Sequence, residues 1–352
     1  MRPFCLLGLR VDHPADSTGG RRSVEGMTPD LVAIADRYRL YASREARGVS
    51  ATFEAWATGL AEDDALLGLL AALPRLKQQP NLVFASARWT GCPVAGFGAF
   101  REWMLGHWPD VESTILARST QTNEAARCSA LVAALAGIDG PVALLEVGAS
   151  AGLCLYPDRY SYRFEHDGGV AALDPADGTS SVVIPCKVGS GIPIPVRLPE
   201  VTWRAGIDQS PIDVRDVEEM RWLETLIWPE RVERVARLHA AAGIAEADPP
   251  HLRRGDLVEL LASTAEWAPR DATLVVFHSA VLGYLSAERR EEFHRIVGDL
   301  DAIWVSNEAP GLVPEAAAQL PADLDVGGRF ILARDGRPLA LTGPHGQSID
   351  GL

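Results

Sequence analysis

Apolar residues repeat at two different periods along this 352-residue chain, and the change divides it in two. From residue 31 to about 136 they recur every three to four positions, as in Phe53–Leu60, which predicts about six helices. Thr28-Pro29 opens the first helix, because a hydroxyl group caps it and proline needs no N–H at its first position. We therefore expect an all-α domain over residues 28–136, preceded by a flexible tail over 1–27.

After residue 137, short apolar runs alternate with longer helical stretches. The runs are Val142–Val147, Val201–Ile207, Thr273–Phe277, Ala302–Val305, Arg329–Ala333 and Pro338–Leu341, and the helical stretches are Val217–Ala242 and Ala287–Leu300. This alternation predicts βαβ units and a doubly wound, mainly parallel sheet. Asp335-Gly336, between the last two runs, is typical of a hairpin turn and predicts an antiparallel edge hairpin. Residues 137–352 should thus form an α/β domain, with an inserted β-hairpin or flap over 160–200.

Charge and cysteine usage exclude several classes of partner. The net charge is −14, and all of it lies in residues 136–352, because residues 1–135 hold 14 basic and 14 acidic side chains. A groove that tracks phosphates needs a local excess of Lys and Arg, so we expect no nucleic-acid partner. No apolar run approaches the ~20 residues that span a bilayer, so we expect no membrane partner. The five cysteines form no C-x-x-C pair, which favours a reducing cytoplasm and predicts no metal site.

The sequence Leu144–Leu153 carries the strongest local signal. A buried strand ends near Glu146 and runs into a turn with glycines at 148 and 152. Such a turn allows backbone N–H groups to approach a ligand. It is compatible with an adenosylmethionine loop in which Ser150 replaces the middle glycine, and with a G-x-S-x-G hydrolase elbow. The G-x-G-x-x-G pattern of a dinucleotide site is not met. A turn required only for tight packing is the remaining alternative.

Polar side chains also follow the later strands. Asp208 ends the second strand, where it could accept ribose hydroxyl groups or form an Asx turn or cap. Asp256 follows a short third strand, where it could meet an adenine amino group or lie at the solvated surface. His278 and Glu308 end the fourth and fifth strands. Because ligands bind at the carboxyl ends of strands in doubly wound sheets, we expect one site there.

The chain resembles a class I, Rossmann-like adenosylmethionine-dependent methyltransferase in its C-terminal half. More closely, from about residue 30 to 352 it is similar to a bacterial family known only as a domain of unknown function. The resemblance rests on 79–84 (QPNLVF), 118–124 (RSTQTNE), 144–153, 203–208 (WRAGID), 222–229, 275–285 and 344–346 (PHG). The methyltransferase resemblance implies S-adenosylmethionine as the cofactor, with Glu146, Gly148, Ser150 and Gly152 around its methionine end. It also implies that Asp208 holds the ribose and that Asp256 and Leu257 flank the adenine.

The helical half is then expected to form the side of the site that contacts the substrate. The stretch 118–124 is dense in hydrogen-bonding groups, and Arg118, Gln121, Asn123 and Glu124 exceed what one helix cap requires. We expect a small-molecule acceptor, and the acidic second half favours a neutral or cationic one over a phosphorylated one.

Three functions are compatible with these residues. In a methyltransferase, His278 is the best candidate for a general base, with Glu308 in reserve, because an imidazole titrates near neutrality. In a serine hydrolase, Ser150 would be the nucleophile, with Asp256 or Asp271 and with His278 or His345. The third possibility is a methyltransferase-like protein that binds a ligand without catalysis.

Overall fold

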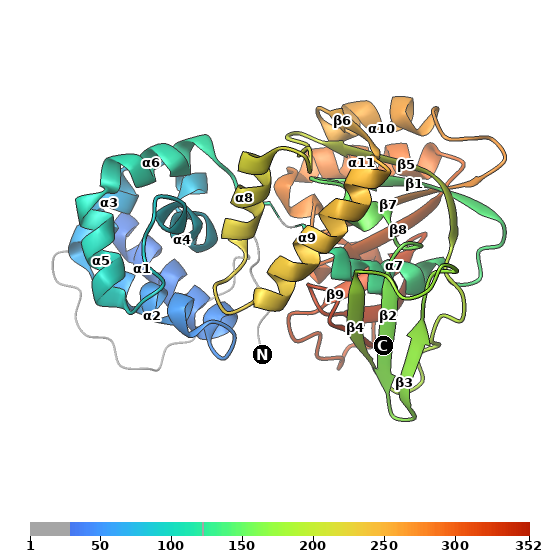
Figure 1. The fold of residues 1–352 in the computed structure, drawn as a ribbon, viewed down its shortest axis with the longest axis horizontal. Helices are drawn as coiled ribbons and strands as arrows, with labels where there is room; N and C mark the ends of the chain where they lie inside the picture. The colour runs from blue at the N-terminus through green and yellow to red at the C-terminus, as the bar shows by residue number, and fades with distance from the viewer. Residues whose placement is uncertain (1–28, 122) are drawn as a thin grey trace. The chain divides into compact units, whose positions relative to one another are not determined.

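The computed structural model describes residues 29–121 and 123–352, so the tail expected over 1–27 lies outside the described residues. The chain divides into two compact units (Figure 1). The helical unit contains 29–121 and 221–232, and the sheet unit contains 123–220 and 233–352. This division differs from the expected boundary at 136/137, because residues 123–136 include a helix that packs on strands of the sheet.

The helical unit is built on an aromatic core. Tyr38, Phe53, Trp56, Phe84 and Phe100 are all buried, and the Trp56 and Phe100 rings stack with centroids 4.4 Å apart. The apolar spacing of the sequence buries one stripe of each helix against this core. The elements are α1 (Pro29–Tyr41), the π-helical turn η1 (Ala42–Ala46), α2 (Ala51–Leu60), α3 (Asp64–Ala71), η2 (Arg75–Lys77), α4 (Pro80–Trp89), α5 (Phe97–Gly106) and α6 (Trp108–Ala117).

The sheet unit is a mixed α/β structure with one large sheet, described here with eleven strands. They are β1 (Pro141–Val147), β2 (Ser161–His166), β3 (Gly169–Leu173), β4 (Val183–Val188), β5 (Glu200–Asp208), β6 (His251–Arg254), β7 (Thr273–Ser279), β8 (Ile303–Glu308), β9 (Phe330–Arg334), β10 (Arg337–Thr342) and β11 (Ser348–Asp350). Their order is β3-β2-β4-β11-β10-β9-β8-β7-β1-β5-β6, and six of the ten pairings are parallel. The block β6-β5-β1-β7-β8 is parallel throughout, so the carboxyl ends of five strands share one edge.

Helices cover both faces of this parallel block. Leu145, Val147 and Val276 pack on the face covered by α10 (Leu257–Ala265), α11 (Ala287–Asp299) and α12 (Pro314–Ala317). Because side chains alternate along a strand, Glu146 and Phe277 lie on the opposite face. There α7 (Cys128–Leu135), which follows the short η3 (Ala125–Arg127), packs against β8 and β9.

Two further helices lead from β5 to β6. The expected single stretch Val217–Ala242 is instead α8 (Val217–Leu226) and α9 (Val232–Ala247). Pro229 lies between them, where its ring and missing N–H are incompatible with a continuous helix. The short turns η4 (Leu153–Leu155), η5 (Leu282–Tyr284) and η6 (Pro310–Leu312) complete the unit.

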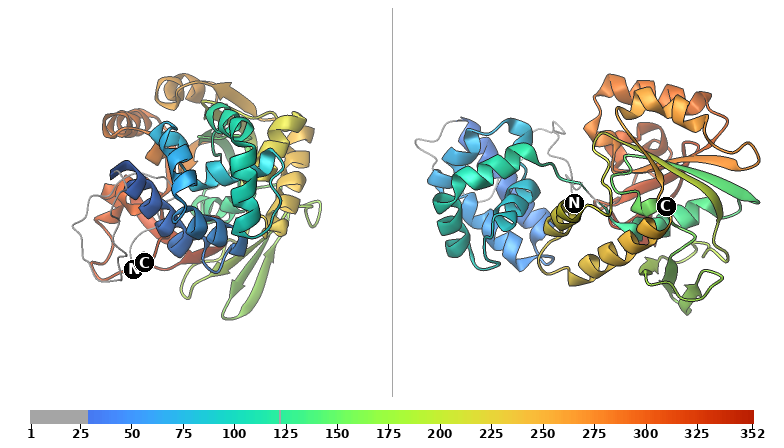
Figure 2. Two further views of the ribbon diagram at one scale, coloured as in Figure 1. Left: turned by 90° about the vertical axis from the view of Figure 1, so that its left-hand side faces the viewer. Right: turned by 45° about the horizontal axis from the view of Figure 1, so that its top comes forward.

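The segment over 160–200 joins the main sheet. Strands β2 and β3 form an antiparallel hairpin, and β2 also pairs with β4, which pairs with β11. The hairpin projects from the sheet unit in both views of Figure 2. The strands β9 and β10 around Asp335-Gly336 are antiparallel, with β11 and then β4 extending the sheet beyond them. Among the described residues, no helix combines the length and apolar character needed to cross a bilayer.

Candidate functional site

The glycine-rich turn after β1 has a left-handed backbone at three positions. Gly148, Ser150 and Gly152 have φ angles of 76°, 50° and 70°. At Gly148 a side chain would also overlap Val281, which packs directly over the turn. Glycine is therefore required at 148 by both backbone conformation and space. The turn leads into η4 rather than into an α-helix.

The backbone N–H groups of this turn are all used within the protein. Five consecutive N–H groups donate to oxygen atoms of neighbouring segments or of the turn itself. The pairs are Gly148 to Ile207 O (2.8 Å), Ala149 to Ile207 O (3.1 Å), Ser150 to Asp208 Oδ2 (2.8 Å), Ala151 to Asn123 Oδ1 (2.8 Å) and Gly152 to Ala149 O (2.6 Å). The turn is consequently held to β5 and to residue 123, and it does not present a row of free amides to a ligand.

The two predicted carboxylates beyond β5 and β6 organise local backbone. Asp208 accepts from the Ser150 N–H and, at its other oxygen, from the Ser210 N–H at 2.8 Å, which is an Asx turn. Asp256 is the N-cap of α10, accepting from the Val258 and Glu259 N–H groups, and it also forms an ion pair with Arg289. Leu257 is buried at the start of that helix. Asp208 remains partly exposed.

Glu146 is the predicted site residue with the least satisfied side chain. It is buried, and its Oε2 atom has no hydrogen-bond partner within the described part of the chain. Burial, followed by the neighbouring Cys154 thiol, holds the pKa of Glu146 well above its usual range, and the Arg127 guanidinium opposes this rise only in part. Burial therefore favours the protonated form of this carboxyl group, and an approaching cation would favour the ionised form.

His278 and Glu308 form a buried pair in which both ring nitrogens of His278 and one oxygen of Glu308 are bonded, whereas Glu308 Oε2 has no partner within the described residues. The His278 Nδ1 atom lies 2.8 Å from Glu308 Oε1, and Trp304 donates its Nε1–H to His278 Nε2 at 3.0 Å. An acceptor at Nε2 places the proton on Nδ1, so the histidine is neutral and donates to the carboxylate. The same Glu308 oxygen accepts from the Val281 and Leu282 N–H groups. Through these bonds the pair positions the loop that covers Gly148.

On the opposite face, a small cavity of about 20 Å³ lies beside β7 and β8. The polar residues that line it are Arg127, Cys154, His278, Ser279 and Asn307. This volume is enough for one water molecule. The carboxyl ends of β7 and β8 thus lie next to residues of η3 and η4 around this cavity.

The predicted substrate stretch 118–124 crosses from one unit to the other. In the helical unit, the Arg118 guanidinium lies over the rings of Trp89 and Trp222, at 5.2 and 5.6 Å from their centroids. Gln121 is the last described residue of that unit before the boundary. Asn123 belongs to the sheet unit, where its Nδ2 group donates to Ser150 Oγ at 2.7 Å.

Glu124, also in the sheet unit, is the centre of a buried ionic cluster. It is 3% exposed, and its oxygens pair with Arg234 Nε at 2.5 Å and with Arg237 Nε at 2.8 Å. Burial alone would raise the pKa of Glu124, but the charges of Arg234 and Arg237 outweigh this effect and lower the pKa to about 2. Arg127 lies close enough to affect Arg234 electrostatically.

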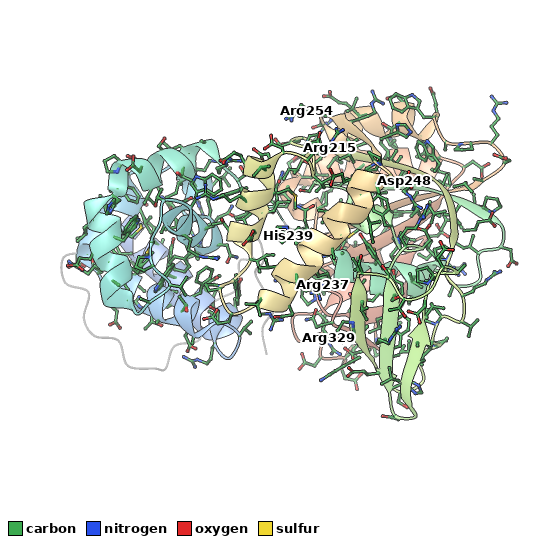
Figure 3. The ribbon with its side chains drawn as sticks, viewed as in Figure 1. Arg215, Arg237, His239, Asp248, Arg254 and Arg329 are labelled. Carbon is green, nitrogen blue, oxygen red and sulfur yellow. The ribbon has the colours of Figure 1, made fainter. Side chains whose placement is uncertain are left out.

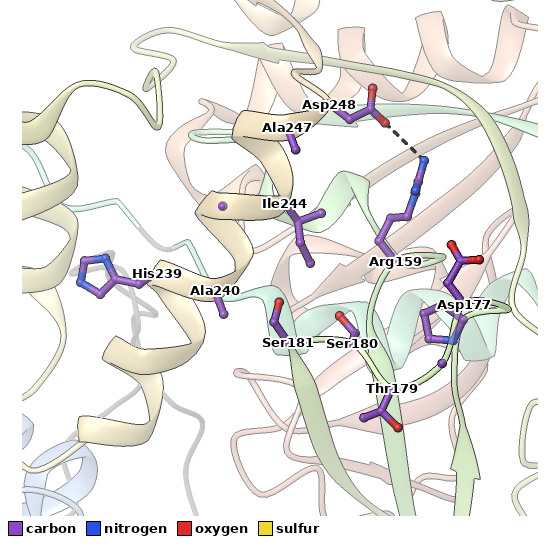
Figure 4. Close-up of a pocket in the computed structure, with 13 residues that line it drawn as sticks. Arg159, Asp177, Thr179, Ser180, Ser181, His239, Ala240, Ile244, Ala247 and Asp248 are labelled. Carbon is purple, nitrogen blue, oxygen red and sulfur yellow. Dashed lines mark ion pairs between the residues drawn. The ribbon is translucent and has the colours of Figure 1, made fainter.

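A groove beside α9 was not predicted from the sequence. Its volume is about 600 Å³, and Figure 4 shows Ala240, Ile244 and Ala247 of α9 facing the loop before β4. An ion pair between Arg159 and Asp248, 3.5 Å long, lies at one end. The sequence does contain small residues at this face of α9, namely Ala240, Gly243 and Ala247. Small residues allow another segment to pack closely on a helix, but they do not indicate a ligand. A second cleft of about 240 Å³ borders the glycine turn and is lined by Ala151, Ile212 and Leu252 among others.

The geometry brings some candidates together and separates others. Glu146, Ser150 and Asp208 lie around one turn, whereas His278 bonds to Glu308 and to Trp304. The Ser150 hydroxyl accepts from Asn123, and no hydrogen bond joins it to a histidine among the described residues. Over the same residues, no group of three or more His, Cys, Asp or Glu side chains is placed to hold a metal ion.

Comparison with known families gives one match. The model of the family described as "Uncharacterized protein conserved in bacteria (DUF2332)" matches residues 35–350. No curated protein and no solved structure matches the chain.

Proposed function

The chain belongs to the bacterial family DUF2332, and we propose that its sheet unit binds S-adenosylmethionine and transfers the methyl group to a small-molecule acceptor. The cofactor would lie at the shared carboxyl edge of the parallel strands, around Glu146, Gly148 and Asp208. In the strand order, β5 and β6 lie on one side of β1, whereas β7 and β8 lie on its other side, so the direction of strand addition reverses at β1. Ligands of doubly wound sheets bind at such a switch point.

The observation that supports the proposal most is that the backbone N–H groups of the turn after β1 already donate hydrogen bonds within the protein. A phosphate-bearing dinucleotide needs free backbone N–H groups at the glycine turn, and here all five are already bonded. Carboxylates, by contrast, retain acceptor capacity at this edge. An adenosyl ligand that lacks phosphates and carries hydroxyl and ammonium donors suits that set of groups.

Asp208 and Glu146 fit the cofactor at its two ends. A carboxylate offers about four acceptor positions, and the Ser150 and Ser210 N–H groups occupy two of those on Asp208. The rest can accept the two ribose hydroxyl groups. Glu146 offers the unpartnered Oε2 atom, which would pair with the ammonium group of the methionine moiety. Pairing with a cation favours the ionised carboxylate, so Glu146 would release its proton on binding.

When bound, the cofactor supplies an electrophilic methyl group, and the protein's task is to place an acceptor in line and exclude water. His278 would act in positioning, because both ring nitrogens are bonded and the ring is 1% exposed. Together with Glu308 it would fix Val281 over Gly148. An acceptor that is already unprotonated, such as a free amine, needs no base at this position.

One observation favours the alternative hydrolase function, namely the φ of 50° at Ser150, since a nucleophile elbow also places its serine in a strained turn. In the described chain no histidine bonds to that serine, and η4 rather than an α-helix follows it. An ester-hydrolysis assay that compares the wild type with Ser150→Ala separates this function from methyl transfer.

The proposal is tested by calorimetric titration with S-adenosylhomocysteine. Glu146→Gln is the sharpest variant, because glutamine mimics the protonated acid and leaves folding unchanged. Asp208→Asn tests the ribose end. The matched controls are Glu292→Gln, at a half-buried residue that pairs with Arg289, and Asp325→Asn, at an exposed residue that also forms an Asx turn. We expect micromolar binding that weakens at least about tenfold in the two site variants and not in the controls. Absence of binding to folded wild-type protein contradicts the proposal.

A further inference from the structure

We propose that Arg127, Arg234 and Arg237 form a binding site for the oxyanion group, a carboxylate or phosphate, of a small molecule. The site is separate from the cofactor contacts proposed above, and its argument does not depend on them. Arg234 and Arg237 lie one turn apart on α9, and Figure 3 shows Arg237 on that helix. Arg127 ends η3, close to Glu124 in the chain.

Two of the three guanidinium groups pair with a single carboxylate, that of Glu124. Glu124 pairs with both α9 arginines, and Arg127 influences Arg234 electrostatically. Within the described residues, Arg127 is bonded to the carbonyl oxygens of Pro344, at 2.9 Å, and Ser279, at 3.0 Å, and to no carboxylate. The cluster therefore contains three fixed positive charges and one negative charge. His345 is close enough to Glu124 to lower its pKa electrostatically, so any charge on the imidazole would add to the positive excess.

Such an excess is costly where water is scarce. The side chains of Arg234 and Arg237 are 13% and 15% exposed, and Arg127 is also buried. Buried charges are normally paired, because a protein interior solvates an isolated ion poorly. Burial of the nearby Glu146 raises its pKa, which favours the neutral form of that carboxyl group in the protein without ligand. An anionic ligand would restore the balance.

Donor atoms remain available for that ligand. Arg237 bonds to Glu124 through Nε, and Arg127 uses Nε and one terminal nitrogen, so terminal N–H groups of both have no protein acceptor within the described part of the chain. Guanidinium groups match carboxylate and phosphate oxygens in a planar, two-bond geometry. The small residual exposure of Arg234 and Arg237 allows a small molecule to reach them. The local charge is thus opposite to that of the acidic sheet unit as a whole.

The test is calorimetric titration of the full chain with two probes, inorganic phosphate and malonate, at low ionic strength. The variant is Arg237→Gln, which leaves Glu124 paired with Arg234 and so should fold. The matched control is Arg295→Gln on α11, whose exposed side chain forms an ion pair with Asp299. We expect at least one probe to bind the wild type and to bind Arg237→Gln at least about tenfold more weakly, with no change in the control.

Two results would overturn this inference. The first is that neither probe binds the folded wild type, or that both bind Arg237→Gln equally well. The second is that Arg237→Gln weakens the binding of S-adenosylhomocysteine but not that of 5′-methylthioadenosine, which lacks the carboxylate. The arginines would then hold the cofactor itself. Because S-adenosylhomocysteine is titrated separately, failure of the oxyanion site and failure of cofactor binding are distinguishable.

Discussion

Replacing Glu124 with glutamine should destabilise the sheet unit strongly at neutral pH. The pKa of Glu124 falls from an ordinary 4.5 to about 2 in the folded protein. One pKa unit corresponds to about 1.4 kcal/mol, so ionisation of this group contributes about 3 kcal/mol of stability at pH 7. Glutamine removes that contribution and leaves Arg234 and Arg237 without their carboxylate. We expect a loss of about 3 to 5 kcal/mol in the free energy of unfolding, as found for broken buried pairs.

The effect has a defined pH dependence. A depressed carboxyl pKa stabilises the fold fully above the unfolded value of 4.5, and this stabilisation is lost as the pH falls toward 2. The difference between wild type and Glu124→Gln should therefore shrink by about 1 to 1.5 kcal/mol between pH 7 and pH 3.5. The assay is urea unfolding followed by far-ultraviolet circular dichroism at both pH values.

Glu292→Gln is the control, because Glu292 also pairs with an arginine, at 2.7 Å, but its side chain is 43% exposed. Exposed pairs contribute about 0 to 1 kcal/mol, so this variant should stay within that range. The reasoning is refuted if Glu124→Gln costs less than about 1 kcal/mol at pH 7, or if its cost is the same at both pH values. Phosphate should also raise the melting temperature of Glu124→Gln more than that of the wild type, since the cluster gains one net positive charge.

Three further predictions concern other parts of the molecule. Gly346→Ala should destabilise the protein by several kcal/mol, roughly 3, because φ is 74° and the added methyl would overlap the Ala126 carbonyl, and thermal unfolding measures this. Burial raises the pKa of Glu45 to about 8, so stability is lost as the pH rises from 4.5 to 8. Glu45→Gln should then exceed the wild type by about 2 to 4 kcal/mol at pH 8 and match it below pH 4.5, by urea unfolding. Burial raises the pKa of Cys186 to about 11, so iodoacetamide at pH 8 should label it in urea and not in the native protein, by mass spectrometry.

The parallel block could be predicted from the sequence because each of its strands is marked by a short apolar run in the sequence itself. Each apolar run from Val142–Val147 onward is long enough to bury one strand, and the alternation with helices implies parallel order. The position of Asp208 could also be predicted from the sequence, since an acid directly after a buried strand must lie at the end of that strand, at the edge of the sheet. The Asx turn that it forms was one of the two roles open to it.

Contacts between distant residues were not predictable in the same way. Glu124 meets Arg237 across 113 positions of the chain, and no periodicity links them. His278 illustrates the same point, because its engagement by Trp304 and Glu308 depends on the register of β7 against β8. The sequence placed the imidazole at a strand end without showing that both of its nitrogens are bonded.

The central claim is that an adenosyl cofactor binds at the turn after β1, and ultraviolet cross-linking of methyl-labelled S-adenosylmethionine tests it most directly. After irradiation and proteolysis, we expect label in peptides that cover 144–156 or 203–212, with competition by unlabelled S-adenosylhomocysteine and loss of label in Glu146→Gln. Competable label confined to other peptides, or no competable label on the folded wild type at saturating cofactor, would contradict the account.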